Sequence, residues 1–384
     1  MKRLVVCFDG TWNNADNPGA DTNVARIARA ICPRDNDGVP QIVLYLRGVG
    51  TTGLHAEKIF SGATGLGVDD NIRSAYMFLA QNYEEGDQIF LFGFSRGSFS
   101  ARSLVGLISG AGLLRRSSLG LLGEAWAYYR TKKPHSPEQF AATRPGTRHH
   151  EGVRIDFLGV WDTVGSMGIP GGIFADVNRD LYGFYDTGPC SIMRRACHAM
   201  AIDEHRDTFV PTFWTGEAPD GVSIDQVWFA GVHSDVGGGY LSRDLADIPL
   251  LWMAKQAQAA GLQADSSALP DEAKLDPLAM QHDSSHGLFA LNRLVPTYRE
   301  LCGMSFDVPL YQRLYQPVDT EGKLIATVRE AVHQSVIDRY GKDAGWCEDD
   351  EKGFADPTRY APPNAAALFT RDGALKEGVR VEPY

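Results

Sequence analysis

Short apolar runs alternate with amphipathic segments along this chain. The apolar runs are rich in β-branched and aromatic residues and have the length of strands that are buried on both faces of a sheet. The intervening segments carry apolar residues at helical spacing, and capping residues such as Thr22 precede several of them. The predicted strands are residues 4–8, 41–46, 89–92, 155–160 and 226–232, and the predicted helices are residues 24–31, 72–83, 99–108 and 250–260.

This alternation predicts an α/β fold with a mostly parallel central sheet and helices on both faces. Polar residues stand at or just past the ends of the predicted strands, namely Asp9, Ser95, Asp162, His233 and Asp235. In such sheets ligands bind beyond the carboxyl ends of the strands. We therefore expect these side chains to converge on one edge of the sheet.

Residues 93–97 read Gly-Phe-Ser-Arg-Gly and lie between a predicted strand and a helix of small residues. In that context the G-x-S-x-G pattern predicts a nucleophile elbow, a turn so tight that it needs glycines and presents the serine hydroxyl alone. Ser95 is the candidate nucleophile. The alternative is a glycine-rich turn without a catalytic role, because the pentapeptide by itself recurs by chance in a chain of this composition.

A serine hydroxyl needs a base to remove its proton, and the base needs a carboxylate to orient it. Among ten histidines, His233 alone directly follows a predicted buried strand, and three glycines come soon after it. His233 is therefore the candidate base, with His282 and His333 as alternatives if the last strand lies further along the chain.

Asp162 is the favoured acid because it closes the strand that follows the nucleophile. Asp235 is the alternative, but it stands only two residues from His233, and so short a separation seldom places a carboxylate on the far ring nitrogen. Asp235 then has a role in stabilising the loop or binding a cation. The order Ser95, Asp162, His233 is that of the α/β-hydrolases.

An oxyanion site would need two backbone N–H groups near the Ser95 hydroxyl. Arg96 is the first candidate donor, and Gly10 or Thr11, past the end of an early strand, is the second. Asp9 is interpreted as a carboxylate that orders this loop by accepting backbone hydrogen bonds.

Composition narrows the classes of function. The 384 residues include 37 Lys and Arg against 48 Asp and Glu, a net charge of −11 that disfavours a nucleic-acid partner. The uncharged stretch at residues 103–114 is well short of the ~20 apolar residues of a membrane span, and the N-terminal apolar run is too brief for a secretory signal. Six scattered cysteines without a C-x-x-C pair predict neither a zinc site nor a disulfide framework, so no metal is expected.

The chain divides into a predicted core and an extension. Residues 1–250 form the hydrolase-like core, in which the aromatic-rich stretch 168–214 is interpreted as a lid or acyl-binding wall, or else as an ordinary insertion. Residues 251–384 begin with a helix and become loop-rich, and we expect them to pack on the core within the same domain. The acidic run at residues 348–351 is interpreted as a solvated loop.

A set of motifs accompanies these candidates along nearly the whole chain. They are residues 8–11 (Phe-Asp-Gly-Thr), 48–51, 93–97, 159–165 (Gly-Val-Trp-Asp-Thr-Val-Gly), 198–206, 233–240 (His-Ser-Asp-Val-Gly-Gly-Gly-Tyr), 333–336 and 360–364. Together they resemble the family of α/β-hydrolases that includes the type VI secretion phospholipase effectors. Trp12 departs from this pattern, because a small residue is expected after the first motif.

The resemblance implies hydrolysis of lipid esters, often glycerophospholipids, by a Ser-Asp-His triad that corresponds to Ser95, Asp162 and His233. It implies no cofactor. The implied partners are a lipid or ester substrate, a membrane surface, and an immunity or secretion-apparatus protein. The implied location is the cytoplasm, or export without a signal peptide by a contact-dependent secretion system.

Two rival classes of function stay open. Asp9 before Gly-Thr is similar to the strand-terminal aspartate of haloacid-dehalogenase phosphatases, but Cys7 and Thr11 stand where a second aspartate is needed. The other rival is a catalytically inert hydrolase-fold binding module or secretion adaptor. A serine-directed fluorophosphonate separates these classes, since only a serine hydrolase would be labelled at Ser95.

Overall fold

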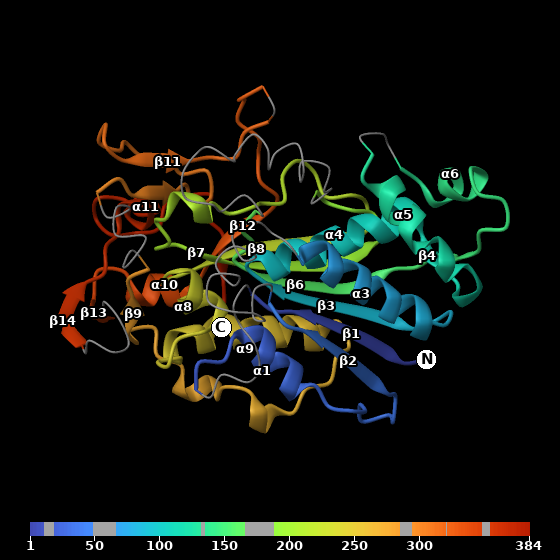
Figure 1. Cartoon of the computed structure of the whole chain (residues 1–384). Helices are drawn as coiled ribbons and strands as arrows, with labels where there is room; N and C mark the ends of the chain where they lie inside the picture. The colour runs from blue at the N-terminus through green and yellow to red at the C-terminus, as the bar shows by residue number, and fades with distance from the viewer. Residues whose placement is uncertain are drawn as a thin grey trace, which may run out of the picture.

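A computed structural model describes residues 1–10, 19–48, 67–131, 135–165, 188–284, 294–319, 321–347 and 354–384. Over these residues an eight-stranded sheet forms the centre of the molecule, in the order β15-β12-β8-β7-β6-β3-β1-β2, and all neighbouring strands run parallel (Figure 1). The strands are β1 (Arg3–Phe8), β2 (Gln41–Leu46), β3 (Gln88–Phe94), β6 (Ile155–Trp161), β7 (Met193–Ala201), β8 (Ser223–Phe229), β12 (Glu330–His333) and β15 (Val381–Glu382). The predicted α/β-hydrolase-like fold, with a mostly parallel sheet, is confirmed.

Helices cover both faces of this sheet, as Figure 1 shows. Alternate residues of β1 pack in opposite directions: Leu4, Val6 and Phe8 contribute to the cluster on one face, and Val5 and Cys7 to the cluster on the other. The first face is covered by α3 (Val68–Asn82), α4 (Arg96–Ala111) and α5 (Leu122–Tyr129), and the second by α1 (Asn23–Ala30) and α9 (Asp244–Ala259). Burial on both faces explains why β1 is apolar from Leu4 to Phe8.

Local capping explains where the first helix begins. The Thr22 hydroxyl accepts a hydrogen bond from the Ala25 N–H at 3.1 Å, which satisfies one of the N–H groups that a helix start leaves unpaired. The remaining helices are α6 (Pro137–Ala142), α8 (His233–Gly237), α10 (Gln334–Arg339) and α11 (Pro363–Ala366). Among the helices that the structure describes, none is both long and apolar enough to cross a membrane.

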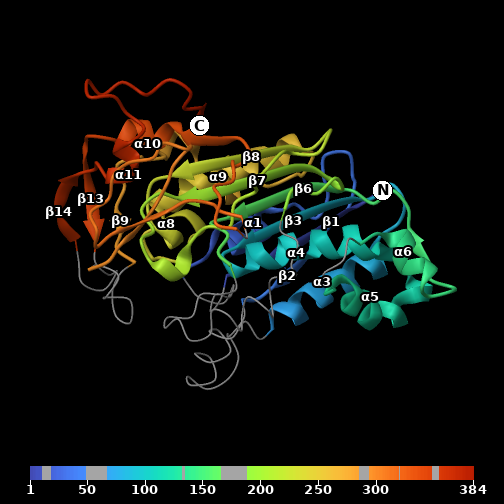
Figure 2. The same cartoon turned by 90° about the horizontal axis from the view of Figure 1, so that it is seen from above.

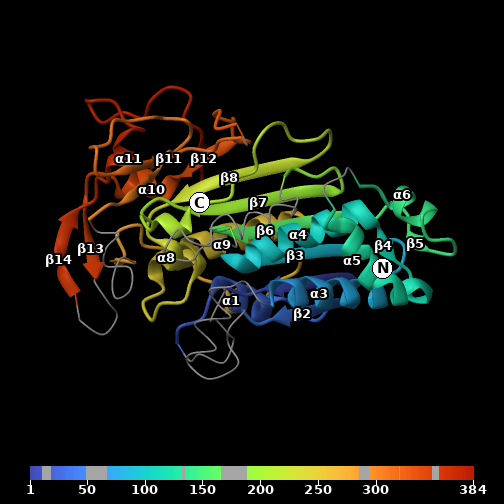
Figure 3. The ribbon, with the colours of Figure 1, turned by 45° about the horizontal axis from the view of Figure 1, so that its top comes forward.

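The stretch 168–214 contains a core strand that the sequence analysis missed. β7 lies between β6 and β8 in the middle of the sheet, and Figure 3 shows the strands side by side. The lid or wall interpretation is therefore wrong for residues 193–201, which fill the sheet. Residues 168–187 lie outside the described residues, as do Thr11, Trp12 and the acidic run at 348–351.

The C-terminal part of the chain is joined to the central sheet. β12 pairs with β8, and β15 pairs with β12, so two strands from beyond residue 250 extend the sheet at its edge. The predicted boundary near residue 250 falls inside α9. Further short strands lie outside the central sheet: β4 (Leu113–Leu114), β5 (His149–His150), β9 (Gln281–His282), β10 (Thr297–Arg299), β11 (Arg313–Tyr315), β13 (Asp343–Cys347) and β14 (Phe354–Arg359). Figure 2 shows β9, β13 and β14 together at the left end of the molecule, on the same side as α8.

Candidate active site

The turn from β3 to α4 has the geometry of a nucleophile elbow. Ser95 lies at its apex with φ 58° and ψ −125°, a conformation that a residue with a side chain seldom adopts. A Cβ on Gly93 would lie 2.6 Å from the Cα of Ser98, and one on Gly97 would lie 2.2 Å from the carbonyl oxygen of Phe8. Both neighbours are backbone atoms that cannot turn aside, so the turn requires glycine at both positions.

The register of the sheet places the elbow beside Asp162. Phe94, the last residue of β3, is paired with Trp161, the last residue of β6. Ser95 and Asp162 directly follow these two residues. The Ser95 N–H donates to the Trp161 carbonyl at 3.0 Å, and the Ser98 hydroxyl donates to the same oxygen at 2.9 Å. The predicted convergence at the carboxyl edge is thus present for these residues.

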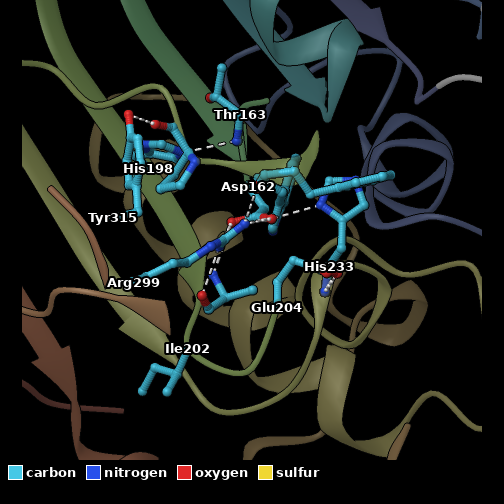
Figure 4. Close-up of polar contacts among 12 residues, drawn as sticks. Asp162, Thr163, His198, Ile202, Glu204, His233, Arg299 and Tyr315 are labelled. Carbon is cyan, nitrogen blue, oxygen red and sulfur yellow. Dashed lines mark hydrogen bonds and ion pairs between the residues drawn. The ribbon is translucent and has the colours of Figure 1, made fainter. Parts of the chain in front are cut away.

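Asp162 and His233 form a buried pair (Figure 4). His233 Nδ1 donates to Asp162 Oδ2 at 2.6 Å, and the two side chains are almost entirely buried. The imidazole packs against the rings of Phe94 and Phe209, with centroids 4.6 and 4.9 Å away. Phe94 directly precedes Ser95, so the imidazole lies next to the elbow. His233 begins α8 instead of directly following β8, which ends at Phe229.

Arg299 holds the other side of the Asp162 carboxylate (Figure 4). Its Nη1 donates to Oδ1 at 2.6 Å and its Nη2 donates to Oδ2 at 3.1 Å. Burial alone would raise the pKa of Asp162, but the Arg299 guanidinium and His233 outweigh burial and hold the pKa well below its usual range. No sequence motif marks Arg299, and it is not among the predicted site residues.

The environment of His233 favours the neutral imidazole that a general base requires. Burial lowers the pKa of His233, and the hydrogen bond and charge of Asp162 oppose this only in part. With Nδ1 donating to Asp162, the lone pair of the neutral ring lies on Nε2.

Glu204 supports the start of α8, where His233 lies. Its Oε2 accepts from the backbone N–H of His233 at 3.3 Å and from Arg206 at 2.7 Å, while its Oε1 accepts from the Ser284 hydroxyl at 3.0 Å. Burial opposes its ionisation, but Arg206 lowers the pKa of Glu204 to about 2. Glu204 lies within the motif at residues 198–206, but the sequence predicts no role for it.

The alternatives Asp235 and His282 pair with each other. His282 Nδ1 donates to Asp235 Oδ1 at 2.6 Å, and Asp235 Oδ2 accepts from the Val232 N–H at 3.0 Å. The His282 ring stacks on Tyr240 with centroids 3.8 Å apart. Asp235 therefore stabilises the loop, and it is not the partner of His233. Within the described ranges, no group of three or more His, Cys, Asp or Glu side chains is arranged to hold a metal.

His333, the remaining alternative base, caps a helix. Its Nδ1 accepts from the Ser335 N–H at 3.2 Å at the start of α10, and its ring stacks on Phe229 at 4.7 Å. Burial lowers the pKa of His333 to about 3. These contacts give His333 a structural role away from Asp162.

In the loop after β1, the Gly10 N–H is not placed as the predicted oxyanion donor. The Gly10 N–H donates to Asp9 Oδ1 at 2.7 Å, so it is engaged by the neighbouring carboxylate instead of being directed at the elbow. Asp9 also accepts from the Tyr45 hydroxyl, and burial raises the pKa of Asp9 to about 6. The loop-ordering role predicted for Asp9 is present. Thr11 lies outside the described residues, and Arg96 begins α4 directly after Ser95.

The parallel sheet, the serine at the elbow and the buried Asp–His pair define an α/β-hydrolase-like protein. Residues 2–256 match the family described as "T6SS, Phospholipase effector Tle1-like, catalytic domain". The chain therefore belongs to the Tle1-like phospholipase effectors of the type VI secretion system.

Several proteins are similar over part of their length. The Saccharomyces cerevisiae protein YEL023C is 31% identical in an alignment 230 positions long that covers 54% of this chain and 32% of the yeast protein. A crystal structure of an uncharacterized Pseudomonas aeruginosa protein is 18% identical with a TM-score of 0.40, covering 71% of this chain and 48% of that one. The Tle1 effector, solved bound to the VgrG spike, is 20% identical with a TM-score of 0.38, covering 63% and 53%. The chain thus spans about half or less of the length of these relatives.

Proposed function

We propose that this protein is a serine hydrolase that cleaves carboxylic esters of lipids, with glycerophospholipids as the substrate class and phospholipase A-type cleavage. Ser95, Asp162 and His233 are its triad. The observation that carries the proposal is the buried 2.6 Å contact between His233 and Asp162. Asp162 directly follows β6, and Ser95 directly follows the neighbouring strand β3.

The chemistry follows from the arrangement of these groups. Ser95 Oγ attacks the ester carbonyl while His233 Nε2 takes its proton, and Asp162 stabilises the imidazolium that forms. The imidazolium returns the proton to the leaving alcohol, which leaves an acyl group on Ser95. A water molecule, deprotonated by His233 in its turn, releases the fatty acid. None of these steps requires a cofactor.

The oxyanion donors are the backbone N–H groups of Arg96 and Thr11. Arg96 is the first residue of α4, and the dipole at this end of the helix favours a developing negative charge. Gly10 is not a proposed donor because its N–H donates to Asp9. Thr11, which follows it in the sequence, is the second proposed donor.

Family membership also supports a route and partners. We propose that the protein leaves the cell through the contact-dependent type VI apparatus and that a spike protein carries it, since the Tle1 effector is bound to the VgrG spike in its solved structure. An immunity protein and a membrane surface complete the proposed partners. An inert binding module remains the alternative.

Parallel hydrolysis assays test the proposal. The wild type, Ser95→Ala and Ser103→Ala are each given a p-nitrophenyl ester and a fluorogenic phospholipid. Ser103 is a matched control because its hydroxyl donates only to the carbonyl of Phe99 within its own helix, at 2.8 Å. We expect Ser103→Ala to keep activity and Ser95→Ala to lose it on both substrates. A faster rate on the phospholipid identifies the substrate class, and no turnover by the folded wild type supports the inert module.

A further inference from the structure

Arg299 comes from a part of the chain outside the family match. It ends β10, which pairs with β11 and not with the central sheet, and it lies 137 residues from Asp162 in the sequence. Residues 2–256 match the catalytic-domain family, so Arg299 belongs to the C-terminal region that follows. A residue of this region nevertheless contacts the proposed catalytic carboxylate.

The Arg299 guanidinium is fixed at four points. Besides both oxygens of Asp162, it donates from Nη1 to the Ala201 carbonyl at 2.7 Å and from Nη2 to the Phe209 carbonyl at 2.6 Å. Its side chain is 1% exposed, like the wholly buried Asp162. Because the guanidinium is planar and presents a rigid fork, these contacts define the plane of the carboxylate as well as its position.

The orientation of that plane matters for His233. Asp162 Oδ1 accepts from Arg299 and from the Ala201 N–H at 3.0 Å, which leaves Oδ2 directed at His233 Nδ1. Without the fork, the carboxylate would be held only by the Ala201 N–H and by His233 itself. The imidazole would then lose the fixed partner that sets its orientation and its tautomer.

The positive charge has a separate effect. The charged groups facing His233 are Asp162, Glu204 and Arg206, with Arg299 behind Asp162. Arg299 offsets part of the negative charge of Asp162, so the imidazolium is less stabilised than it would be beside a lone carboxylate. Loss of this charge is therefore expected to raise the pKa of His233.

Other residues beyond position 256 contact the same edge of the sheet. These contacts include His282 with Asp235, Ser284 with Glu204, Tyr360 with Asp203, and Asn364 with the Ile202 carbonyl. Asn364 Nδ2 also donates to the Arg299 carbonyl at 3.4 Å. The C-terminal region thus fixes both the loop that carries His233 and the backbone of β10.

We infer that Arg299 is a positioning residue of the triad, and that the C-terminal region completes the active site by supplying it. The inference rests on the proposed function, because it assumes that Asp162 and His233 act in catalysis. Because its side chain is 1% exposed, Arg299 acts through Asp162 and not through direct contact with a substrate.

Kinetics of three variants test this role. Arg299→Gln removes both the fork and the charge, Arg299→Lys keeps the charge without the fork, and Arg339→Gln is the control. Arg339 is equally buried and donates to the carbonyls of Pro277 and Ala279 at 2.7 and 2.8 Å, away from Asp162. For both Arg299 variants we expect kcat to fall on the order of 10²-fold with little change in KM, as for a misplaced catalytic group. The control should keep the wild-type kcat.

The pH profile separates charge from geometry. In Arg299→Gln the acid limb of kcat/KM should move to higher pH by about one unit, because the loss of a neighbouring cation raises the histidine pKa. In Arg299→Lys the limb should stay near that of the wild type. If Arg299→Gln does not fold, Arg299→Lys alone tests the inference. A low kcat with an unmoved acid limb in Arg299→Lys supports it, and a wild-type kcat in Arg299→Lys overturns it.

A readout independent of turnover keeps the inference distinct from the proposed function. The pKa of His233 is measured by NMR on histidine-labelled protein, with the signal assigned by its loss in His233→Gln. A wild type without esterase activity refutes the proposed function, while a higher His233 pKa in Arg299→Gln still shows the coupling. An unchanged His233 pKa together with an unchanged kcat overturns the role of Arg299.

Discussion

Asp162→Asn removes one charge from a buried pair while keeping the size of the side chain. Asp162 is wholly buried and Arg299 is 1% exposed, so the variant leaves a guanidinium in the interior without its counter-ion. The new amide also presents an N–H group to a site already crowded with donors. Both effects destabilise the folded state.

The size of the effect follows from the remaining contacts. Breaking one partner of a buried ion pair costs about 3–5 kcal/mol. Arg299 keeps its hydrogen bonds to the Ala201 and Phe209 carbonyls, which favours the lower end of that range, about 3 kcal/mol. Catalysis should suffer further, since amide replacement of a triad aspartate lowers kcat about 10⁴-fold where it has been measured in a Ser-His-Asp enzyme.

The pH dependence has a definite sign. The folded-state pKa of Asp162 is depressed, so its contribution to stability is complete above the unfolded-state value of about 3.9 and is lost as the pH falls further toward the folded-state pKa. The difference in stability between the wild type and Asp162→Asn should therefore be constant near neutrality and shrink below about pH 4.

Urea denaturation followed by tryptophan fluorescence at pH 7 and at pH 3 measures this difference. Asp220→Asn is the control, because Asp220 is exposed and its replacement should change stability by less than ~0.5 kcal/mol. A loss below about 1 kcal/mol at pH 7, or a loss as large at pH 3 as at pH 7, would refute the assignment of Asp162 and Arg299 as a strongly coupled pair.

Three further predictions concern the elbow, the second histidine and a buried acid. Gly97→Ala should abolish activity or folding because its methyl group would lie 2.2 Å from a carbonyl of β1, whereas Gly123→Ala, whose methyl meets nothing within 4 Å, should be neutral in the esterase assay. His282→Gln should lower the melting temperature and keep most of kcat, whereas His233→Gln should remove kcat; the reverse result would exchange their roles. Burial raises the pKa of Asp203 to about 7, so the stability of the wild type relative to Asp203→Asn should fall as the pH rises from about 4 through 7 in urea titrations, and a flat difference would contradict this.

Local signals explain what could be predicted from the sequence. The strand before the elbow is a continuous apolar run and the turn itself requires glycines, so five strands and the elbow were recognised with boundary errors of a few residues. The meeting of Asp162 and His233 follows from the parallel sheet, because β6 and β8, with β7 between them, end at the same edge. The triad as a catalytic unit stays a prediction.

The missed features lack a local signal. β7 contains Arg194, Arg195 and His198, which interrupt its apolar pattern, although most of its residues are buried. β12 and β15 are four and two residues long, too short for an alternation to be recognised. Arg299 is defined by contacts across 137 residues, which no motif encodes.

The measurement that tests the central claim most directly is fluorophosphonate labelling of the folded protein, with the modified peptide identified by mass spectrometry. The account predicts a single adduct on Ser95, formed by the wild type and by Ser103→Ala but not by Ser95→Ala, and formed far more slowly by His233→Gln because the base is missing. A folded wild type that stays unlabelled, or an adduct on another serine that persists in Ser95→Ala, would contradict it.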